Sequence, residues 1–459
     1  MSKKIKISAI VVIVVIAMVV MLRPEKKDSL MQHKTWAKES KETTGLDEEG
    51  NLATHLPVVI LHTKGERIPG EDPTEEEKLS CEYSIIFNED GVNRSDDEPY
   101  QSGKAQISIR GNSSRDFPKK QYAIKLLDDM GMGTEKPLLD MPAGSTWTLN
   151  GSYIDESQIR NYLLYHLSSF MSLDAPRCRL CEVMIENEEG DLEYQGLYTL
   201  FEKVKVSKNR LNLTNYDPSY AETSFLLQTN SNIDNMEVRH LMKTFAFTYQ
   251  FDLEYPSVEE LTQPSYDYIQ ENVVVLEKTL FDAERSGEWG KVHEMIDMDS
   301  FVDYFLVNEF FQNYDAGRRS TYIYKNVGEK FTMGPVWDFD GAFDNFMDLH
   351  MPVDELKMRR QFYYAYLMQD PAFVNRCIER FKELRGTYLS EEYLLSLIDE
   401  TVDYLGEAPL RNCDKWYEGD HSAFYDDVED MKTYIKRRGK WMDENFERKC
   451  TIIDWKENS

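Results

Sequence analysis

Short apolar or alternating runs dominate the first half of the chain and predict β-strands. They occur at residues 56–62, 82–87, 105–110, 119–126, 147–150, 182–186, 196–201 and 225–228. Segments rich in Gly, Pro and Asp separate many of these runs and predict loops. One helix is expected in this half, at 157–171, because Ile159, Leu163 and Leu167 recur at helical spacing.

The pattern changes to a helical period from about residue 256. Apolar and aromatic stripes cover 257–287, 297–314 and most of 351–446. Two further strand-like runs, 321–326 and 331–337, are joined by a turn short enough for a hairpin. We therefore expect an α+β protein with a mainly antiparallel β N-terminal half and a helical C-terminal half.

The hairpin at 321–337 has an acidic residue at each end. Asp315 lies in the polar turn before the first strand, and Asp338 follows the second. A hairpin returns the chain to its starting point, so the two carboxylates are expected to lie close together. Phosphoryl transfer uses such a pair, one for the acceptor hydroxyl and one for the metal on the nucleotide phosphates. The alternative is a buried hairpin with solvated acids at its ends.

A second hairpin, at 105–126, has a basic turn. Gly111, Ser113 and Ser114 follow Arg110, and backbone N–H groups in such a turn can bind an anion. On the next strand Lys125 has apolar neighbours, as a phosphate-contacting lysine would. The alternative is an edge-strand lysine whose stem covers apolar surface while its ammonium reaches water.

Glu202 ends an apolar run and is the candidate partner of Lys125. Kinases hold the phosphate-contacting lysine with a glutamate in this way. A surface glutamate at the end of a strand is the alternative.

Composition narrows the class of protein. The 459 residues, 41% of them hydrophobic, suffice for one large domain or two ordinary ones. The net charge of −29 argues against a nucleic-acid partner and favours cations or basic protein segments.

The N-terminus predicts a membrane signal. Lys3, Lys4 and Lys6 precede an apolar run at 7–22, which suits a signal-peptide core or a short anchor. No small-residue cleavage site follows, so we expect an uncleaved anchor over 1–23 rather than a cleaved signal. The remaining chain would then lie outside the cytoplasmic membrane, after a polar linker at 24–52.

Six cysteines fit an oxidising compartment without proving that any are paired. Cys178 and Cys181 have CxxC spacing, but zinc would need a second such pair, and a redox site would need a thioredoxin-like pattern. A disulfide or two ordinary core thiols remain as interpretations.

Five blocks of sequence resemble the spore-coat protein H (CotH) kinase family, an atypical, extracytoplasmic branch of the protein-kinase-like fold. They are IRGNSSRDFPKKQYAIKL (109–126), WTLNGSYIDESQIRNYL (147–163), YQGLYTLFEKVKVSKNRL (194–211), VNEFFQNYD (307–315) and GPVWDFDGAFDN (334–345). The resemblance implies a kinase-like domain over 53–450, with an N-lobe at about 53–228 and a C-lobe at about 229–450.

The resemblance also implies roles for the matching residues. Asp315 would be the catalytic aspartate, and Asp338 the metal-binding one, with Asp340 assisting. The nucleotide-binding residues would be Arg110, Gly111, Ser113, Ser114, Lys125 and Glu202. ATP with Mg²⁺ or Mn²⁺ would be the cofactors, and Ser or Thr of secreted or envelope proteins the acceptor.

One departure concerns the metal. Family members commonly carry asparagine four or five residues after the catalytic aspartate, where this chain has Arg319 and Ser320. Ser320 can offer an oxygen to Mg²⁺, whereas arginine cannot; otherwise one metal ligand is missing. The rival function is therefore a CotH-like binding or assembly protein of the cell envelope or spore coat that transfers no phosphate. A third interpretation is a glycosidase, which needs two carboxylates that face each other across a sugar-binding cleft.

Overall fold

The computed structural model describes every residue except 1–43, 89–90, 231–236, 239–249, 347–349 and 452–459. The anchor expected over 1–23 and most of the linker expected at 24–52 lie outside the described residues. None of the helices in the described part of the chain is long and apolar enough to cross a membrane.

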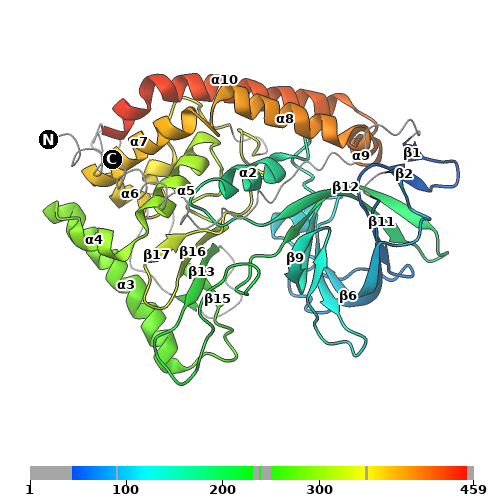
Figure 1. Cartoon of the computed structure of the whole chain (residues 1–459), viewed down its shortest axis with the longest axis horizontal. Helices are drawn as coiled ribbons and strands as arrows, with labels where there is room; N and C mark the ends of the chain where they lie inside the picture. Colours follow the sequence, from blue (N-terminus) through cyan, green and yellow to red (C-terminus); the bar gives the residue numbers. More distant parts are fainter. Residues whose placement is uncertain (1–43, 89–90, 231–236, 239–249, 347–349, 452–459) are drawn as a thin grey trace, which may run out of the picture.

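The first half of the chain forms a closed barrel, at the right of Figure 1. Its strands are β3 (Val58–His62), β4 (Leu79–Ile86), β6 (Gln101–Ile109), β7 (Tyr122–Leu127), β10 (Thr146–Asn150), β11 (Cys178–Glu186) and β12 (Leu192–Glu202). Their order is β10-β12-β11-β3-β4-β6-β7, and pairing of β7 with β10 closes the barrel. Alternate residues such as Ile107, Ile124 and Leu149 are buried, as the period of two predicted.

Two short strands precede the barrel. β1 (Gly45–Leu46) pairs with β2 (Leu52–Thr54), which pairs with β5 (Asn93–Arg94). The end of the segment expected to be a polar linker is therefore ordered into strands. The reason is apolar burial, because Leu52 is 1% exposed and packs in a cluster with Val58 and Ile60. A separate pair, β8 (Lys136–Leu138) and β9 (Met141–Gly144), lies between β7 and β10.

A second sheet lies in the other half of the molecule. It consists of β13 (Phe225–Asn230), β14 (Glu237–Val238), β15 (Gln250–Tyr255), β16 (Thr321–Lys325) and β17 (Phe331–Met333), in the order β14-β15-β13-β16-β17. The predicted hairpin at 321–337 is confirmed as β16 and β17, which are antiparallel.

Helices lie to the left of and above this sheet in Figure 1, and the upper ones continue back to the barrel. They are α2 (Arg160–Ser169), α3 (Gln263–Ser286), α4 (Gly290–Met295), α5 (Met298–Phe310), α6 (Tyr364–Leu367), α7 (Pro371–Arg385), α8 (Glu391–Leu405), α9 (Ala408–Trp416) and α10 (Ser422–Thr451). Side-chain caps start several of them: Asp297 accepts a hydrogen bond from the Ser300 N–H at α5, and Ser390 caps α8. The α+β class predicted from periodicity is confirmed.

The cysteines are free thiols in the described structure. Cys178 and Cys181 lie buried on β11, which agrees with two core thiols rather than a disulfide. Burial raises the pKa of both thiols, so neither is activated as a nucleophile.

Candidate active site

Asp315 and Asp338 lie beside each other where the β16–β17 hairpin opens. Asp315 follows α5, and burial together with the nearby Asp338 carboxylate raises the pKa of Asp315 to about 6. The Asn313 side chain links the two ends, because its Nδ2 donates to the Asp338 carbonyl oxygen at 3.1 Å. The proximity that the hairpin pattern predicted is therefore present.

Ser320 completes this group. Its Oγ donates to Asp338 Oδ2 at 3.0 Å, so the serine at the asparagine position points to the expected metal acid. Both residues have left-handed backbones, with φ of +50° at Ser320 and +64° at Asp338. Non-glycine residues adopt this region at an energetic cost, which concentrates at functional sites.

Helix α2 positions the segment that follows Asp338. Asn161 accepts the Phe339 N–H at 2.8 Å and donates through Nδ2 to Asp340 at 2.5 Å. One turn later, the Tyr165 hydroxyl is 3.3 Å from the Asp338 nitrogen. Helix α2, which follows the barrel strand β10, therefore orients Asp338 and Asp340, which follow the second sheet.

Asp340 lies behind Asp338. Its Oδ1 accepts from Ser152 Oγ at 2.8 Å as well as from Asn161, and the side chain is 8% exposed. Burial and the Asp338 and Asp155 charges raise the pKa of Asp340 to about 7. These contacts indicate that Asp340 supports the site from the protein interior. Its assistance at the metal stays a prediction.

The cluster of acids is suited to a cation. Burial raises the pKa of Asp338 as well, against the opposing effects of Ser320 and Arg110. A bound cation would relieve this crowding of carboxylates. In the described residues no three Asp, Glu, His or Cys side chains form a metal site by themselves. Any Mg²⁺ here would need further oxygens, as it does when nucleotide phosphates complete its shell.

Arg110 brings a positive charge from the barrel to the acids. It follows β6, donates to Gln121 Oε1 at 2.8 Å, and has its guanidinium 5.7 Å from the centre of the Trp337 ring. Its charge opposes the upward shift of the Asp338 pKa. Of the cations predicted to bind nucleotide, Arg110 is the one whose charge acts on Asp338.

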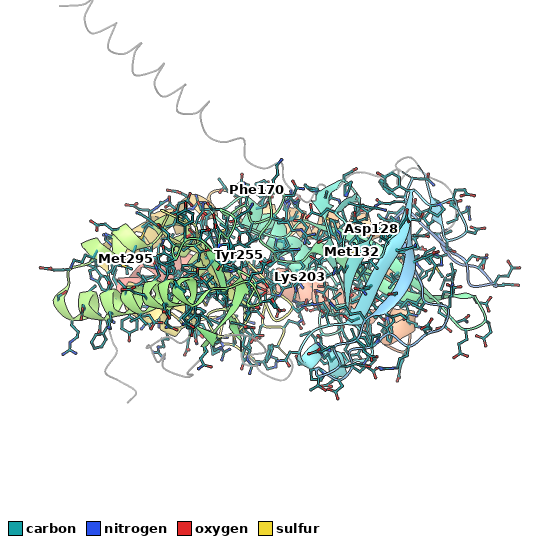
Figure 2. The ribbon with its side chains drawn as sticks, turned by 90° about the horizontal axis from the view of Figure 1, so that it is seen from below. Asp128, Met132, Phe170, Lys203, Tyr255 and Met295 are labelled. Carbon is teal, nitrogen blue, oxygen red and sulfur yellow. The ribbon has the colours of Figure 1, made fainter. Side chains whose placement is uncertain are left out.

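Lys203 and Glu254 lie in the same region and were not found from the sequence. Burial lowers the pKa of Lys203, and the Glu254 and Arg110 charges act on it as well. Figure 2 places Lys203 and Tyr255 near the middle of the molecule, between Met295 on one side and Met132 on the other. A usable signal was present, because Lys203 directly follows Glu202 in one of the five blocks.

The basic turn adopts a compact form. Gly111 has φ of +109°, and Arg115 donates to its carbonyl at 2.6 Å. A side chain at Gly111 would collide with Ser114 Oγ, so Ser114 folds back onto the glycine. Among the described contacts, none joins Ser113 or Ser114 to Asp338, and nucleotide binding by this turn stays a prediction.

The expected pairing of Lys125 with Glu202 is wrong. Trp147 is directly opposite both Ile124 and Glu202 in the sheet, and opposite residues share a face. Glu202 therefore lies on the face of Ile124, whereas Lys125, the next residue, lies on the other face. The sequence did not predict this, because β7 and β12 are not paired with each other. Both pair with β10, and that pairing sets which of their residues share a face.

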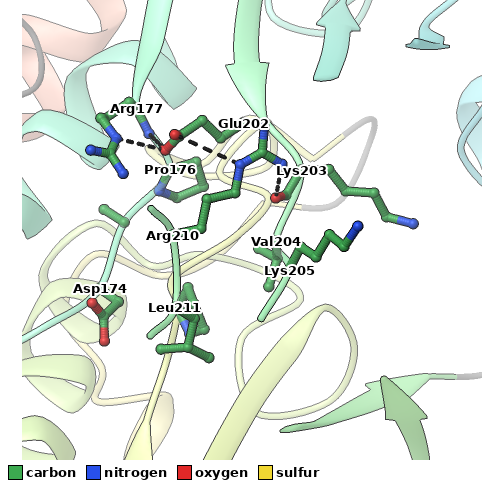
Figure 3. Close-up of a pocket in the computed structure, with 11 residues that line it drawn as sticks. Asp174, Pro176, Arg177, Glu202, Lys203, Val204, Lys205, Arg210 and Leu211 are labelled. Carbon is green, nitrogen blue, oxygen red and sulfur yellow. Dashed lines mark hydrogen bonds and ion pairs between the residues drawn. The ribbon is translucent and has the colours of Figure 1, made fainter. Parts of the chain in front are cut away.

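Glu202 instead pairs with arginines at the end of the barrel (Figure 3). Its Oε2 is 2.9 Å from Arg177 Nε, and its Oε1 is 3.8 Å from Arg210 Nε. These residues line a small cavity of about 30 Å³ that Lys205 and Pro335 also border. With its carboxylate buried between two guanidinium groups, Glu202 has a structural role there.

Comparison with known families agrees with the residues that form the site. The CotH kinase protein family matches residues 107–442, a stretch that includes Arg110, Asp315, Ser320 and Asp338. The chain belongs to the CotH kinase protein family. No curated protein matches it. The CotH resemblance drawn from the five sequence blocks is therefore confirmed.

This CotH-family chain places one more cation beside Asp315. Lys357 precedes the short helix η2 (Met358–Arg360), and its Nζ donates to the Tyr314 carbonyl at 3.2 Å. Burial and the charge of Arg318 lower the pKa of Lys357 to about 7, against the effects of Glu309 and Asp315. No sequence motif marked Lys357, because it reaches the site by packing of a distant segment.

Proposed function

We propose that this CotH-family protein is an atypical protein kinase that transfers the γ-phosphate of ATP to Ser or Thr. The observation that carries the proposal is the group formed by Asp315, Ser320 and Asp338, with the Arg110 charge acting on it from the barrel. A β-rich half and a helical half that both contribute to one site are compatible with a kinase-like fold.

Each residue has a role in this proposal. Asp338 and Ser320 would hold Mg²⁺ or Mn²⁺, because both offer the oxygen ligands that these ions prefer. When bound, the ion would neutralise charge on the phosphates. Arg110 would contact the phosphates from the barrel side, with Lys203 near it. Lys125, on the other face of β7 from the buried Ile124, is the weaker candidate for that contact.

Asp315 would orient the acceptor hydroxyl and take its proton as the oxygen–phosphorus bond forms. With a pKa of about 6 it is mostly ionised at neutral pH yet basic enough to accept a proton. Positioning and charge neutralisation supply most of the rate in phosphoryl transfer, which suits a site built from fixed carboxylates.

The location of this activity is also a proposal. The apolar run at 7–22 with basic residues before it supports an anchored protein whose catalytic part lies outside the cytoplasmic membrane. Its substrates would then be secreted or envelope proteins.

A binding or assembly protein without phosphate transfer is the second candidate. Arg319 favours it, since arginine stands at one of the two positions where asparagine is common in the family. The contact of Ser320 with Asp338 supports the kinase, because a hydroxyl beside this carboxylate could serve as a metal ligand.

The test is transfer of radioactive γ-phosphate from ATP to the protein itself and to a generic protein substrate, with Mg²⁺ and with Mn²⁺. Asp315→Ala and Asp338→Ala should each lower the rate by about 100-fold or more, the scale of a lost catalytic group. Asp430→Ala, which removes an exposed acid from α10, serves as the control.

Thermal stabilisation by nucleotide and metal separates the two functions. We expect Mg²⁺–ATP to stabilise the wild type and Asp315→Ala, but not Asp338→Ala. Stabilisation without any transfer would favour the binding protein, and equal labelling of all variants would refute the kinase.

A further inference from the structure

Cations gather on the acceptor side of the proposed site. Arg318, Arg319 and Lys357 each oppose the upward shift of the Asp315 pKa. They come from two segments that lie side by side, since a side chain at Gly317 would collide with Gln361. This local positive charge contrasts with the net charge of −29 of the whole chain.

Different cations act on the two acids. The charge that acts on Asp338 is that of Arg110, whereas Arg319 and Lys357 act on Asp315. Arg110 therefore belongs to the proposed nucleotide and metal side. The cations beside Asp315 belong to the side at which an acceptor hydroxyl must arrive.

Tyr314 contacts two of these cations. The Arg318 guanidinium and the Lys357 ammonium each lie 4.2 Å from the centre of the Tyr314 ring, and both donate to the Tyr314 carbonyl oxygen. A ring and a carbonyl orient a cation but leave its net charge in place.

Glu309, one of the two acids whose charges act on Lys357, is engaged with other partners. Glu309 forms a 2.6 Å ion pair with Arg438, and it accepts backbone N–H groups from Lys357 and Met358. In the part of the chain that the structure describes, neither Lys357 nor Arg319 forms an ion pair of its own. Arg319 is also exposed, so an incoming chain can reach it.

We infer that the acceptor side recognises an anionic group, a carboxylate or a phosphate, next to the Ser or Thr that receives phosphate. The inference rests on the proposed function. It differs from the expectation of basic partners drawn from the net charge. Charges more than about 10 Å away are largely screened at physiological salt, so Arg319, and Lys357 in its protonated form, act on an acceptor more strongly than the distant acids do.

Binding of labelled peptides at pH 6, where Lys357 with its pKa of about 7 is mostly protonated, tests this directly. Four peptides would share one Ser acceptor and differ only in flanking residues: glutamate, phosphoserine, glutamine or lysine. We expect the first two to bind the wild-type protein about 5- to 10-fold more tightly than the lysine peptide, which corresponds to two partly exposed charge pairs. The glutamate and phosphoserine arms distinguish a carboxylate from a phosphate.

Variants assign the preference to the cations. Arg319→Gln should reduce the preference for anionic over lysine peptides, and Arg319→Gln with Lys357→Gln should bring this preference below about twofold. Lys440→Gln, on the exposed face of α10, should leave the preference unchanged. Arg319→Gln alters an exposed side chain, so it keeps the test valid if the double variant fails to fold. Equal or tighter binding of the lysine peptide, or an unchanged preference in the Arg319 variant, would overturn the inference.

The same peptides separate this inference from the kinase proposal. If phosphate transfer occurs, KM should follow the binding order, with the lowest KM for the anionic peptides. Transfer with no preference for anionic peptides refutes the inference alone. A preference in binding with no transfer to any peptide refutes the kinase proposal alone.

Discussion

At the scale of one residue, the buried acid Asp315 opposes folding at neutral pH. Burial and the Asp338 carboxylate raise its pKa to about 6, so the folded state holds the proton more tightly than the unfolded chain does. Below the unfolded pKa of 3.8 both states are protonated and the shift has no effect on stability. As the pH rises from there through about 6, the folded state loses stability, and the loss persists at higher pH.

We predict that Asp315→Asn raises the free energy of unfolding at pH 7 by about 2 kcal/mol in the absence of metal, since each pKa unit corresponds to about 1.4 kcal/mol and solvent reaches part of the group. The gain should shrink towards zero as the pH approaches 4. Urea unfolding with a chelator at several pH values measures it.

Asp430→Asn is the matched control, because this acid is exposed on α10. It should give no gain at any pH. A loss of stability in Asp315→Asn at pH 7, or the same change at every pH, would contradict the raised pKa.

At the scale of elements, α2 connects the barrel to the acids. Asn161 and Tyr165 are four residues apart and so lie on the same side of the helix. Both contact the Asp338 segment. The apolar spacing at 157–171 predicts a helix. It does not predict that two polar side chains of this helix contact the segment that carries the acids.

We predict that Asn161→Ala lowers the free energy of unfolding by about 2–3 kcal/mol. The change leaves the buried Phe339 N–H without its acceptor and removes a donor from Asp340, and each lost partner costs about 1–3 kcal/mol. Chemical denaturation measures the loss.

Asn445→Ala provides the comparison, because the Asn445 side chain contacts the Trp441 carbonyl within α10. Its effect should stay within about 0.5 kcal/mol. An equally small effect of Asn161→Ala would mean that α2 does not support the acids.

At the scale of the whole molecule, the C-terminal helices hold the two halves together. Figure 1 shows α8 and α10 extending from the helical half to α9, which lies against the barrel. Arg411 of α9 forms a 2.7 Å ion pair with Glu182 of β11, which is fully buried. Asn412 accepts a hydrogen bond from the buried Lys119 at 2.8 Å. Polar contacts therefore set the position of α9 on the barrel.

We predict that Arg411→Met destabilises the protein by about 3–5 kcal/mol, because it leaves the Glu182 carboxylate buried without its partner. The double variant Arg411→Met with Glu182→Leu should lose less than the single variant. Denaturant unfolding of the single and double variants tests both statements.

Lys440→Met, on the exposed face of α10, should have little effect. If Arg411→Met were equally mild, the ion pair would contribute little to the position of α9. A larger loss in the double variant than in the single one would contradict the role of the unpaired carboxylate.

Local pattern in the sequence was enough to predict the α+β class, the β16–β17 hairpin and the approach of Asp315 to Asp338. These features depend on residues close in the chain, and the hairpin turn by itself brings the two acids together. The five family blocks added the CotH assignment. Ser320 was also predicted to lie at the metal side, and its hydroxyl contacts Asp338.

Other features depend on contacts between segments that are distant in sequence. The partner of Glu202 depends on the face of the sheet on which Glu202 lies. That face is fixed only when β12 pairs with β10 in the closed barrel. The cations beside Asp315 include Lys357, which arrives from a segment beyond the hairpin. Sequence patterning thus determined the local elements and the acids, whereas tertiary packing decided which charges face them, because a side chain's face and neighbours follow from long-range register.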